Sequence, residues 1–405
     1  MERLQRCDIP LGVKLHALLL TVFIDTVGFG IVLPLLPYFA EKFGATPLVV
    51  TLLATVYSFT QFIFAPIWGK LSDRFGRRPI ILLTLAGMII GYALLAFSGS
   101  LLLLFFARAF TGAMAANGGV VHAYVADITN SSERAGGMGK LGAAHGLGFI
   151  VGPAIGGIFA GSDPLNPNLT GPFLIAVGLS ACALVIAVFQ VKETNSPVEI
   201  SHSFEPARSL VKLFFSMVRM PQFALLLILL TFTPFVFSGV ETTFVLWSER
   251  QFGWGPWQNG WIYAAMGSAA VITQWFLVAP FTRRFGERRL IRAGALLIVF
   301  GCLFLPFTSG YADLSLVFVL IVMGVSFNNP SLNSLISNYA GPGERGSLLG
   351  LAMSFSAFAR ITGPAWAGFA FEIFGRSWPF FSGAIIMGTM FLLALRLRRP
   401  GGERK

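Results

Sequence analysis

The amino-acid sequence predicts an all-α integral membrane protein with twelve transmembrane helices in two six-helix halves. Charged residues make up only 12% of the 405 residues, and the mean hydropathy is +0.75; soluble domains carry about 25% charged residues. The stretches 79–107 and 314–343 contain no Asp, Glu, Lys or Arg. About 20 apolar residues suffice to cross a bilayer. Short motifs also recur at a nearly constant offset, which predicts two related halves.

Helices are expected rather than a β-barrel, because barrel strands alternate apolar and polar residues in short segments. A helix also satisfies its backbone hydrogen bonds within the segment, as lipid requires. The first apolar run is expected to remain as a span rather than be cleaved as a signal peptide, since Asp25 lies in its middle and eleven spans follow. The expected spans are 15–37, 48–69, 79–98, 101–124, 136–160, 170–191, 222–247, 257–280, 289–308, 313–337, 346–370 and 377–397.

The basic residues are distributed unevenly between the two sides of this twelve-span arrangement. Loops on the side of the termini, together with the span ends that adjoin them, hold 24 of the 29 Lys and Arg residues, and the opposite loops hold Lys42, Arg250 and Arg376. This positive-inside bias predicts cytoplasmic termini and a multi-pass protein of the bacterial inner membrane. The net charge of +11 therefore indicates topology, and no nucleic-acid partner is expected.

The sequence shows no recognisable enzyme signature. It contains no P-loop, HExxH or GxSxG pattern and no Cys/His cluster with metal-ligand spacing. Cys7, Cys182 and Cys302 lie far apart and are expected to be small apolar residues. We therefore expect neither an enzyme nor a bound metal or cofactor, and energy for any transport would come from an ion gradient.

Matching motifs divide the chain into two halves. Glu133-Arg134 recurs as Glu344-Arg345 at an offset of 211, and Gly152-Pro153 recurs as Gly363-Pro364 at the same offset. Phe75-Gly76 recurs as Phe285-Gly286. Two parallel six-helix repeats are one known transporter plan, with the substrate site between the halves near the middle of the membrane. The expected parts are residues 1–191, a cytoplasmic linker at 192–221, and 222–405 with a short basic tail.

Three motifs resemble those of the major facilitator superfamily. GKLSDRFGRRP at 69–79 is similar to the loop motif GxLxDRxGRR, and FARAFTG at 106–112 is similar to a fourth-helix motif. GFIVGPAIGG at 148–157 fits GxxxGPxxGG, which marks the drug:proton antiporters of the superfamily. The stretch QFIFAP at 61–66 is most similar to the tetracycline-efflux branch. The resemblance implies a major facilitator fold and proton-coupled efflux of an amphipathic, drug-like molecule by alternating access.

The sequence departs from the tetracycline exporters at three positions. Those proteins carry acidic residues in the third and ninth helices and a His in the eighth, where this chain has Gly91, about Ile298 and about Ala270 respectively. Tetracycline as the substrate is therefore an open question. Transport of a metabolite, coupling to sodium and a non-transporting sensor or scaffold remain alternatives. The partners expected are a small-molecule substrate, protons and the lipid bilayer, with the protein as a monomer.

Charged residues inside spans cost about 2.5–3.5 kcal/mol each on insertion scales and so call for a function. Asp25 occupies the family's acidic first-helix position and is the leading proton carrier, because burial favours the uncharged carboxyl and allows titration near neutral pH. The alternative is a structural hydrogen bond. Arg108 can stabilise a deprotonated carboxylate or simply bond to backbone carbonyls. The expected proton-coupling residues are Asp25, Arg108, Glu241, His122 and His145.

Asp73 is the one acid in the basic 69–79 loop. In the family this acid acts as a conformational latch against the other half, and here its expected partners are the start of the eleventh span near Ser347, where the helix dipole is positive, or Arg134. The alternative is a topology signal with a local ion pair, and Asp127 is expected to have a local structural role. The expected latch residues are Gly69, Asp73, Arg74, Gly76, Arg77, Arg78 and Arg134.

The fifth span carries small residues at a spacing of four, from Ala144 to Ala160. Such a face allows close helix packing, and Pro153 removes a backbone donor and bends the helix. A tight hinge between the halves and ordinary helix packing both fit this pattern. The expected antiporter-helix residues are Gly148, Gly152, Pro153, Gly156 and Gly157.

Polar amides in apolar helices tend to face the interior, so they are candidates for substrate contacts. Asn117 and Asn328 are equivalent at the repeat offset of 211. Arg360 can bind an anionic substrate group. The expected substrate-binding residues are Gln61, Asn117, Asn328, Asn329 and Arg360.

Overall fold

A computed structural model describes residues 11–130, 133–194, 220–338 and 345–397. All regular elements of these ranges are helices. The N-terminal group is α1 (Leu11–Val32), α2 (Leu36–Glu41), α3 (Pro47–Phe75), α4 (Arg77–Ala96), α5 (Leu101–Met114), η1 (Ala115–Asn117), α6 (Gly118–Ile128), α7 (Arg134–Ala160) and α8 (Thr170–Gln190). The C-terminal group is α10 (Pro221–Phe252), α11 (Pro256–Ile272), η2 (Thr273–Leu277), α12 (Val278–Phe285), α13 (Glu287–Phe304), η3 (Leu305–Phe307), α14 (Tyr311–Asn338), α15 (Arg345–Phe374) and α16 (Trp378–Ala394).

The helices agree with an integral membrane protein. Within the described residues, ten helical segments are long and apolar enough to cross a bilayer, and α16 is a shorter apolar helix. One expected span was wrong as a continuous helix: 15–37 breaks into α1 and α2 at residues 33–35, where Pro34 lies in the turn and Pro37 lies in the first turn of α2. The number of spans and their orientation stay predictions, and most of the expected linker at 192–221 lies outside the described residues.

Two equivalent glycines begin corresponding helices in the two groups. Gly76 precedes α4 with φ 101° and ψ 156°, and Gly286 precedes α13 with φ 78° and ψ 157°. Residues with a side chain rarely adopt this backbone conformation, so the Phe-Gly repeat marks the same sharp turn twice. The end of the molecule that carries the 69–79 loop is called the motif side below, and the other end is called the far side.

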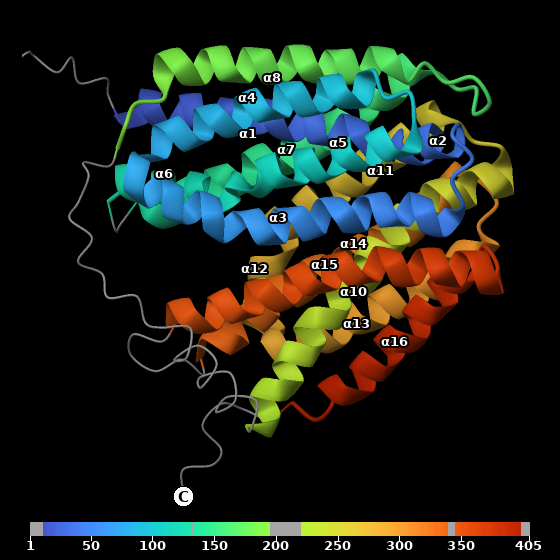
Figure 1. The fold of residues 1–405 in the computed structure, drawn as a ribbon. Helices are drawn as coiled ribbons and strands as arrows, with labels where there is room; N and C mark the ends of the chain where they lie inside the picture. Colours follow the sequence, from blue (N-terminus) through green and yellow to red (C-terminus); the bar gives the residue numbers. More distant parts are fainter. Residues whose placement is uncertain (1–10, 131–132, 195–219, 339–344, 398–405) are drawn as a thin grey trace, which may run out of the picture.

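The two groups of helices meet along α7–α11 and α3–α15 (Figure 1). At the far side the approach is close, because a Cβ on Gly157 would lie 2.7 Å from the Pro256 carbonyl oxygen. Gly368 of α15 likewise packs directly on Leu48 and Thr51 of α3. Small residues permit such contacts between backbones in a membrane.

The motif-side portion of α3 has fewer neighbours. Five of the six residues from 62 to 67 are exposed, whereas residues 50–57 at the far-side portion are buried or partly buried. A helix packed against both groups would expose only one face. The described conformation is therefore closed between the groups at the far side and open toward the motif side.

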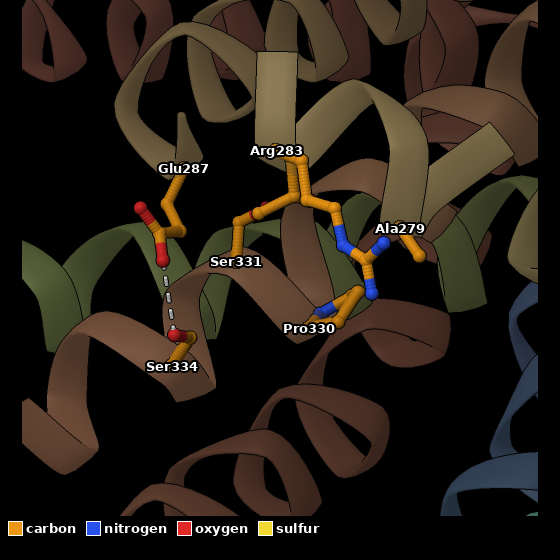
Figure 2. Close-up of a pocket in the computed structure, with 7 residues that line it drawn as sticks. Ala279, Arg283, Glu287, Pro330, Ser331 and Ser334 are labelled. Atoms are coloured by element: carbon orange, nitrogen blue, oxygen red, sulfur yellow. Dashed lines mark hydrogen bonds between the residues drawn. The ribbon is translucent and has the colours of Figure 1, made fainter. Parts of the chain in front are cut away.

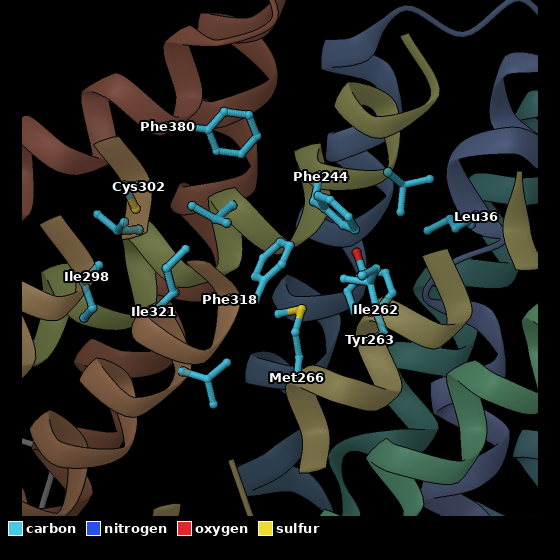
Figure 3. Close-up of a cluster of buried hydrophobic side chains, with 14 of the residues drawn as sticks. Leu36, Phe244, Ile262, Tyr263, Met266, Ile298, Cys302, Phe318, Ile321 and Phe380 are labelled. Carbon is cyan, nitrogen blue, oxygen red and sulfur yellow. The ribbon is translucent and has the colours of Figure 1, made fainter. Parts of the chain in front are cut away.

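A continuous apolar core joins the groups where they are closed. Phe244 of α10 packs edge-to-face on Phe318 of α14 with ring centroids 4.7 Å apart, and Tyr263 of α11 packs on the Phe244 ring at 5.9 Å. Leu36 of α2 belongs to the same buried cluster (Figure 3). The N-terminal group therefore contributes to the core of the C-terminal group at the far side.

Candidate functional site

Asp25 lies in the middle of α1 with an incompletely paired carboxyl group. Its Oδ1 atom is buried and has no hydrogen-bond partner among the described residues, and the same holds for the hydroxyl of Tyr92. Buried polar atoms are normally paired, because an unpaired one costs about 1–3 kcal/mol. The arrangement disagrees with the alternative of a structural hydrogen bond through Oδ1, and it leaves this oxygen available to bind a proton.

Arg108 of α5 is 3% exposed and lies against an aromatic ring. Its guanidinium carbon is 4.3 Å from the centroid of the Tyr57 ring of α3, and its Nε atom has no hydrogen-bond partner in the described chain. A cation over an aromatic face is stabilised by the ring quadrupole, by about 2 kcal/mol when desolvated. Arg108 makes no ion pair with a described carboxylate, so its charge is held by Tyr57.

The C-terminal group brings two more charged residues to the same region. Arg360 of α15 interacts electrostatically with Glu241 of α10 and with Tyr57 of α3, without an ion pair to either. Tyr57 also interacts electrostatically with Asp25 and Arg108. Arg360 is exposed although it lies in the middle of its helix, and its electrostatic neighbours Glu241 and Tyr57 come from different groups of helices.

Three of the predicted charges, Asp25, Arg108 and Arg360, therefore interact with Tyr57 at the boundary of the two groups. The fourth, Glu241, is connected to them through Arg360. Such a centre can bind protons and recognise a charged ligand. Sequence reasoning did not select Tyr57 and Tyr92 as site residues. A tyrosine in an apolar helix could have indicated a polar site, because its hydroxyl requires a polar partner when buried.

The two candidate histidines bond to their own helices. The Nδ1 atom of His122 lies 2.8 Å from the Gly118 carbonyl oxygen, and that of His145 lies 3.0 Å from the Leu141 carbonyl oxygen. Donation from Nδ1 leaves Nε2 free to accept a proton in each ring. The two rings also interact electrostatically with each other, across α6 and α7.

Asp73 forms a local ion pair in this conformation. It accepts from the guanidinium of Arg77, which lies across the turn at Gly76 as the first residue of α4, and its side chain is 64% exposed. Arg77 also bonds to Asp127 at 3.4 Å, whereas Arg134 donates to the Ala126 carbonyl oxygen at 3.2 Å. The local ion pair is thus present, and the expected contact of Asp73 with Arg134 is not formed here. The side chain of Ser347 lies outside the described residues.

A residue missed by the sequence analysis, Glu193, stabilises this loop. Its carboxylate accepts from the backbone N–H of Arg77 at 2.9 Å and of Arg78 at 3.2 Å. These are N–H groups of the first turn of α4, which have no partner within the helix and carry partial positive charge. The same carboxylate fills the space beside Gly76 that a side chain would need.

The glycines of α7 pack on both groups. A Cβ on Gly148, Gly152 or Gly156 would meet α1 within 2.6 Å, at Thr26, Val27 and Ile31 respectively. Gly157 instead meets Pro256 and Gly260 of α11. One face of α7 thus serves packing within the N-terminal group, and the other forms the contact between groups that a hinge requires.

The candidate amides make hydrogen bonds within their own groups. Gln61 donates to the Ala115 carbonyl oxygen at 3.3 Å, and Asn117 donates to Thr84 at 2.8 Å. Asn328 is 2% exposed and donates to Thr233 at 3.3 Å, while Asn329 is partly buried. In this conformation Asn328 is therefore a packing residue, and substrate contact by the amides stays a prediction.

A cavity of about 320 Å³ opens elsewhere, on the motif side of the C-terminal group (Figure 2). Arg283 and Glu287 line it, and Ser334 donates to Glu287 at 3.3 Å. It is formed by α12, α13 and α14 and does not include Asp25, Glu241 or Arg360. The described residues contain no cluster of His, Cys, Asp and Glu suited to a metal ion.

Long apolar helices in two groups are typical of a polytopic membrane protein, and charged residues at the boundary of two such groups are typical of a transporter. The model of the Major Facilitator Superfamily matches residues 18–364 and 250–405. The chain is 32% identical to tetracycline resistance protein, class B, of Escherichia coli over 93% of this chain and 92% of that protein. It is 29% identical to multidrug resistance protein 2 of Bacillus subtilis (strain 168) over 96% and 95% of the two chains.

Two solved structures are also similar. The human organic anion transporter MFSD10 (TETRAN) is 25% identical with a TM-score of 0.69, covering 96% of this chain and all of that one. The nucleoside transporter NupG is 13% identical with a TM-score of 0.74 over 95% of this chain and 98% of that one, and shows the fold alone. The chain belongs to the major facilitator superfamily.

Proposed function

We propose that this protein exports amphipathic, drug-like molecules in exchange for protons, by alternating access across the bacterial inner membrane. The central observation is that Asp25, Arg108 and Arg360 interact with Tyr57 at the boundary of the two halves, with Glu241 connected through Arg360. The similarity to tetracycline and multidrug resistance proteins over nearly the whole chain supports efflux of such compounds. Proton coupling is typical of this family.

The proposed topology has twelve spans, with the motif side in the cytoplasm. The positive-inside distribution supports this orientation, because basic residues collect in motif-side loops. The described conformation is then closed to the outside and open to the cytoplasm. In the reverse conformation Asp73 acts as the latch that holds the motif side closed.

In the proposed cycle, Asp25 carries the proton and Arg108 favours its release. An incompletely paired carboxyl binds a proton readily when desolvated, and a nearby fixed cation stabilises the charged form once the site is hydrated. Glu241 is the second proton or ligand site, and its electrostatic contact with Arg360 would respond to protonation. Because substrate and proton bind at the same boundary, they compete for the site, and this competition couples the export of one to the entry of the other.

Arg360 suits substrates that carry an anionic group together with an apolar body. Its accessible guanidinium offers several donors and keeps its charge. The similarity to a human organic anion transporter supports including organic anions in the substrate range. The absence of the tetracycline exporters' third- and ninth-helix acids leaves tetracycline as one compound to test.

Drug accumulation in cells tests this function. An efflux-deficient bacterial strain would express wild type, Asp25→Asn or the matched loop variant Asp163→Asn, and a panel of tetracycline, ethidium and a fluorescent organic anion would be followed. We expect several-fold lower accumulation of at least one compound with wild type and Asp163→Asn, reversed by a protonophore and lost in Asp25→Asn. Equal accumulation of every compound in cells with and without wild type would contradict efflux and favour the alternative, metabolite transport.

A further inference from the structure

The far-side closure contains a polar cluster that the central site does not use. Arg250 at the end of α10 pairs with Glu41 of α2 at 2.9 Å and thus joins the two halves. The guanidinium of Arg250 also lies 4.9 Å from the centroid of the Phe371 ring. Arg376 donates to the carbonyl oxygen of Arg250 at 2.8 Å. The position of Arg250 is therefore fixed from several directions.

A buried tether lies beside this ion pair. The hydroxyl of Tyr38 in α2 donates to the Trp254 carbonyl oxygen at 2.7 Å and accepts from Asn259 at 2.7 Å. Asn259 is fully buried and accepts from Ser248 at 2.7 Å. These bonds hold α2 of one half against α10 and α11 of the other, so they can form only when the far side is closed.

A second carboxyl group meets Glu41 in this cluster. Glu249 immediately precedes Arg250, the ion-pair partner of Glu41, near the end of α10, and its carboxyl group interacts with that of Glu41. Two carboxylates can bond directly only when one proton is shared between them, because ionised carboxylates are acceptors only. Glu41 is partly buried, with 22% of its side chain exposed, so water screens the repulsion incompletely.

We infer that Glu41 and Glu249 form a proton-binding site on the far side, and that its proton stabilises the closed state of the outer gate. The site is separate from Asp25 and Glu241, and its proton need not cross the membrane. The charged or titratable groups on the elements around it are Tyr38, Lys42, Glu249, Arg250, Glu372 and Arg376. Among these, Arg250 opposes proton binding by Glu41 and Glu249 favours it.

The direction of the pH effect follows from the closed geometry. Burial and the neighbouring Glu249 raise the pKa of Glu41 from 4.5 to about 7, against the effect of Arg250. In the open state the two groups separate into water, and Glu41 returns to its ordinary range. The closed state therefore binds the proton more tightly. The closed-to-open ratio falls as pH rises between about 4.5 and 7, by at most about tenfold per pH unit, and levels off above pH 7.

Spin-label distances measured without substrate test this inference. Cys7, Cys182 and Cys302 are replaced by alanine, and labels are placed at Gly99→Cys in one half and Phe307→Cys in the other. Both positions are exposed on the far side, away from the cluster. The full-length protein is measured in lipid nanodiscs over a pH range from acidic to mildly alkaline that spans both ends of the expected transition.

In wild type we expect the population with the short label-to-label distance to fall as pH rises to about 7. In Glu41→Gln and Glu249→Gln we expect this population to keep the value that wild type has at low pH, at every pH measured. The amide mimics a permanently neutral carboxyl. Asp163→Asn, a far-side loop control, is expected to titrate as wild type does. A wild-type distribution independent of pH, or a response that persists in both Gln variants, would overturn the inference. Because no cargo is needed, the result is independent of whether efflux itself is found.

Discussion

At the scale of single residues, the central site depends on side chains whose polar atoms are incompletely paired. Asp25 and Arg108 each retain a buried atom without a hydrogen-bond partner among the described residues, and Tyr57 interacts electrostatically with both and with Arg360. Such groups lower stability, so a membrane protein that keeps them is expected to use them. The sequence could identify the four charges, because each interrupts an apolar span. It could not identify Tyr57, because the role of this residue depends on the meeting of four helices, α1, α3, α5 and α15.

The stacking of Arg108 on Tyr57 gives a prediction about one ring. Tyr57→Phe keeps the aromatic face 4.3 Å from the guanidinium and is expected to retain most transport. Tyr57→Ala removes it, and the loss of about 1–2 kcal/mol at a desolvated cation should lower the transport rate roughly tenfold. Initial rates in proteoliposomes measure the difference. Equal rates in Tyr57→Ala and wild type would show that the ring is not needed to hold Arg108.

At the scale of elements, α7 is the helix whose sequence pattern and structure agree best. The spacing of four placed Gly148, Gly152 and Gly156 on one face, and that face packs on α1. The sequence did not show that Gly157 has a different role from these glycines, since it forms the contact between the halves with α11. The break between α1 and α2 was also missed, because an apolar run continues through Pro34 and periodicity alone does not show where a helix turns.

Two alanine substitutions in α7 test this packing. A Cβ on Gly156 would lie 2.6 Å from the Ile31 carbonyl oxygen, so Gly156→Ala must push α1 and α7 apart and should destabilise the protein by about 1–3 kcal/mol. Gly142, in the same helix, has no atom within 4 Å of such a Cβ. Gly142→Ala should therefore leave stability unchanged or raise it by up to about 1 kcal/mol. Thermal unfolding in detergent compares the two, and equal shifts would refute the role given to the α1 contact.

At the scale of the whole molecule, the fold class was predictable and the conformation was not. Low charge content, long apolar runs and the repeat offset predicted a helical membrane protein, and the loop and antiporter motifs predicted the superfamily. Which side is closed depends on contacts between segments hundreds of residues apart, such as Gly368 with Thr51 and Glu41 with Arg250. The sequence predicted Asp73 as a latch, and in this conformation its ion-pair partner is Arg77 in the same loop.

The most direct test of the account is proton movement driven by substrate. Purified protein is reconstituted in liposomes that contain a pH-sensitive dye, a proton gradient is imposed, and the compound found in the accumulation experiment is added. The account predicts that wild type and Asp163→Asn dissipate the gradient when the compound is added, while Asp25→Asn does not. Dissipation of the same size in wild type and Asp25→Asn would contradict the assignment of Asp25 as the proton carrier, and transport of the compound without any proton movement would contradict antiport itself.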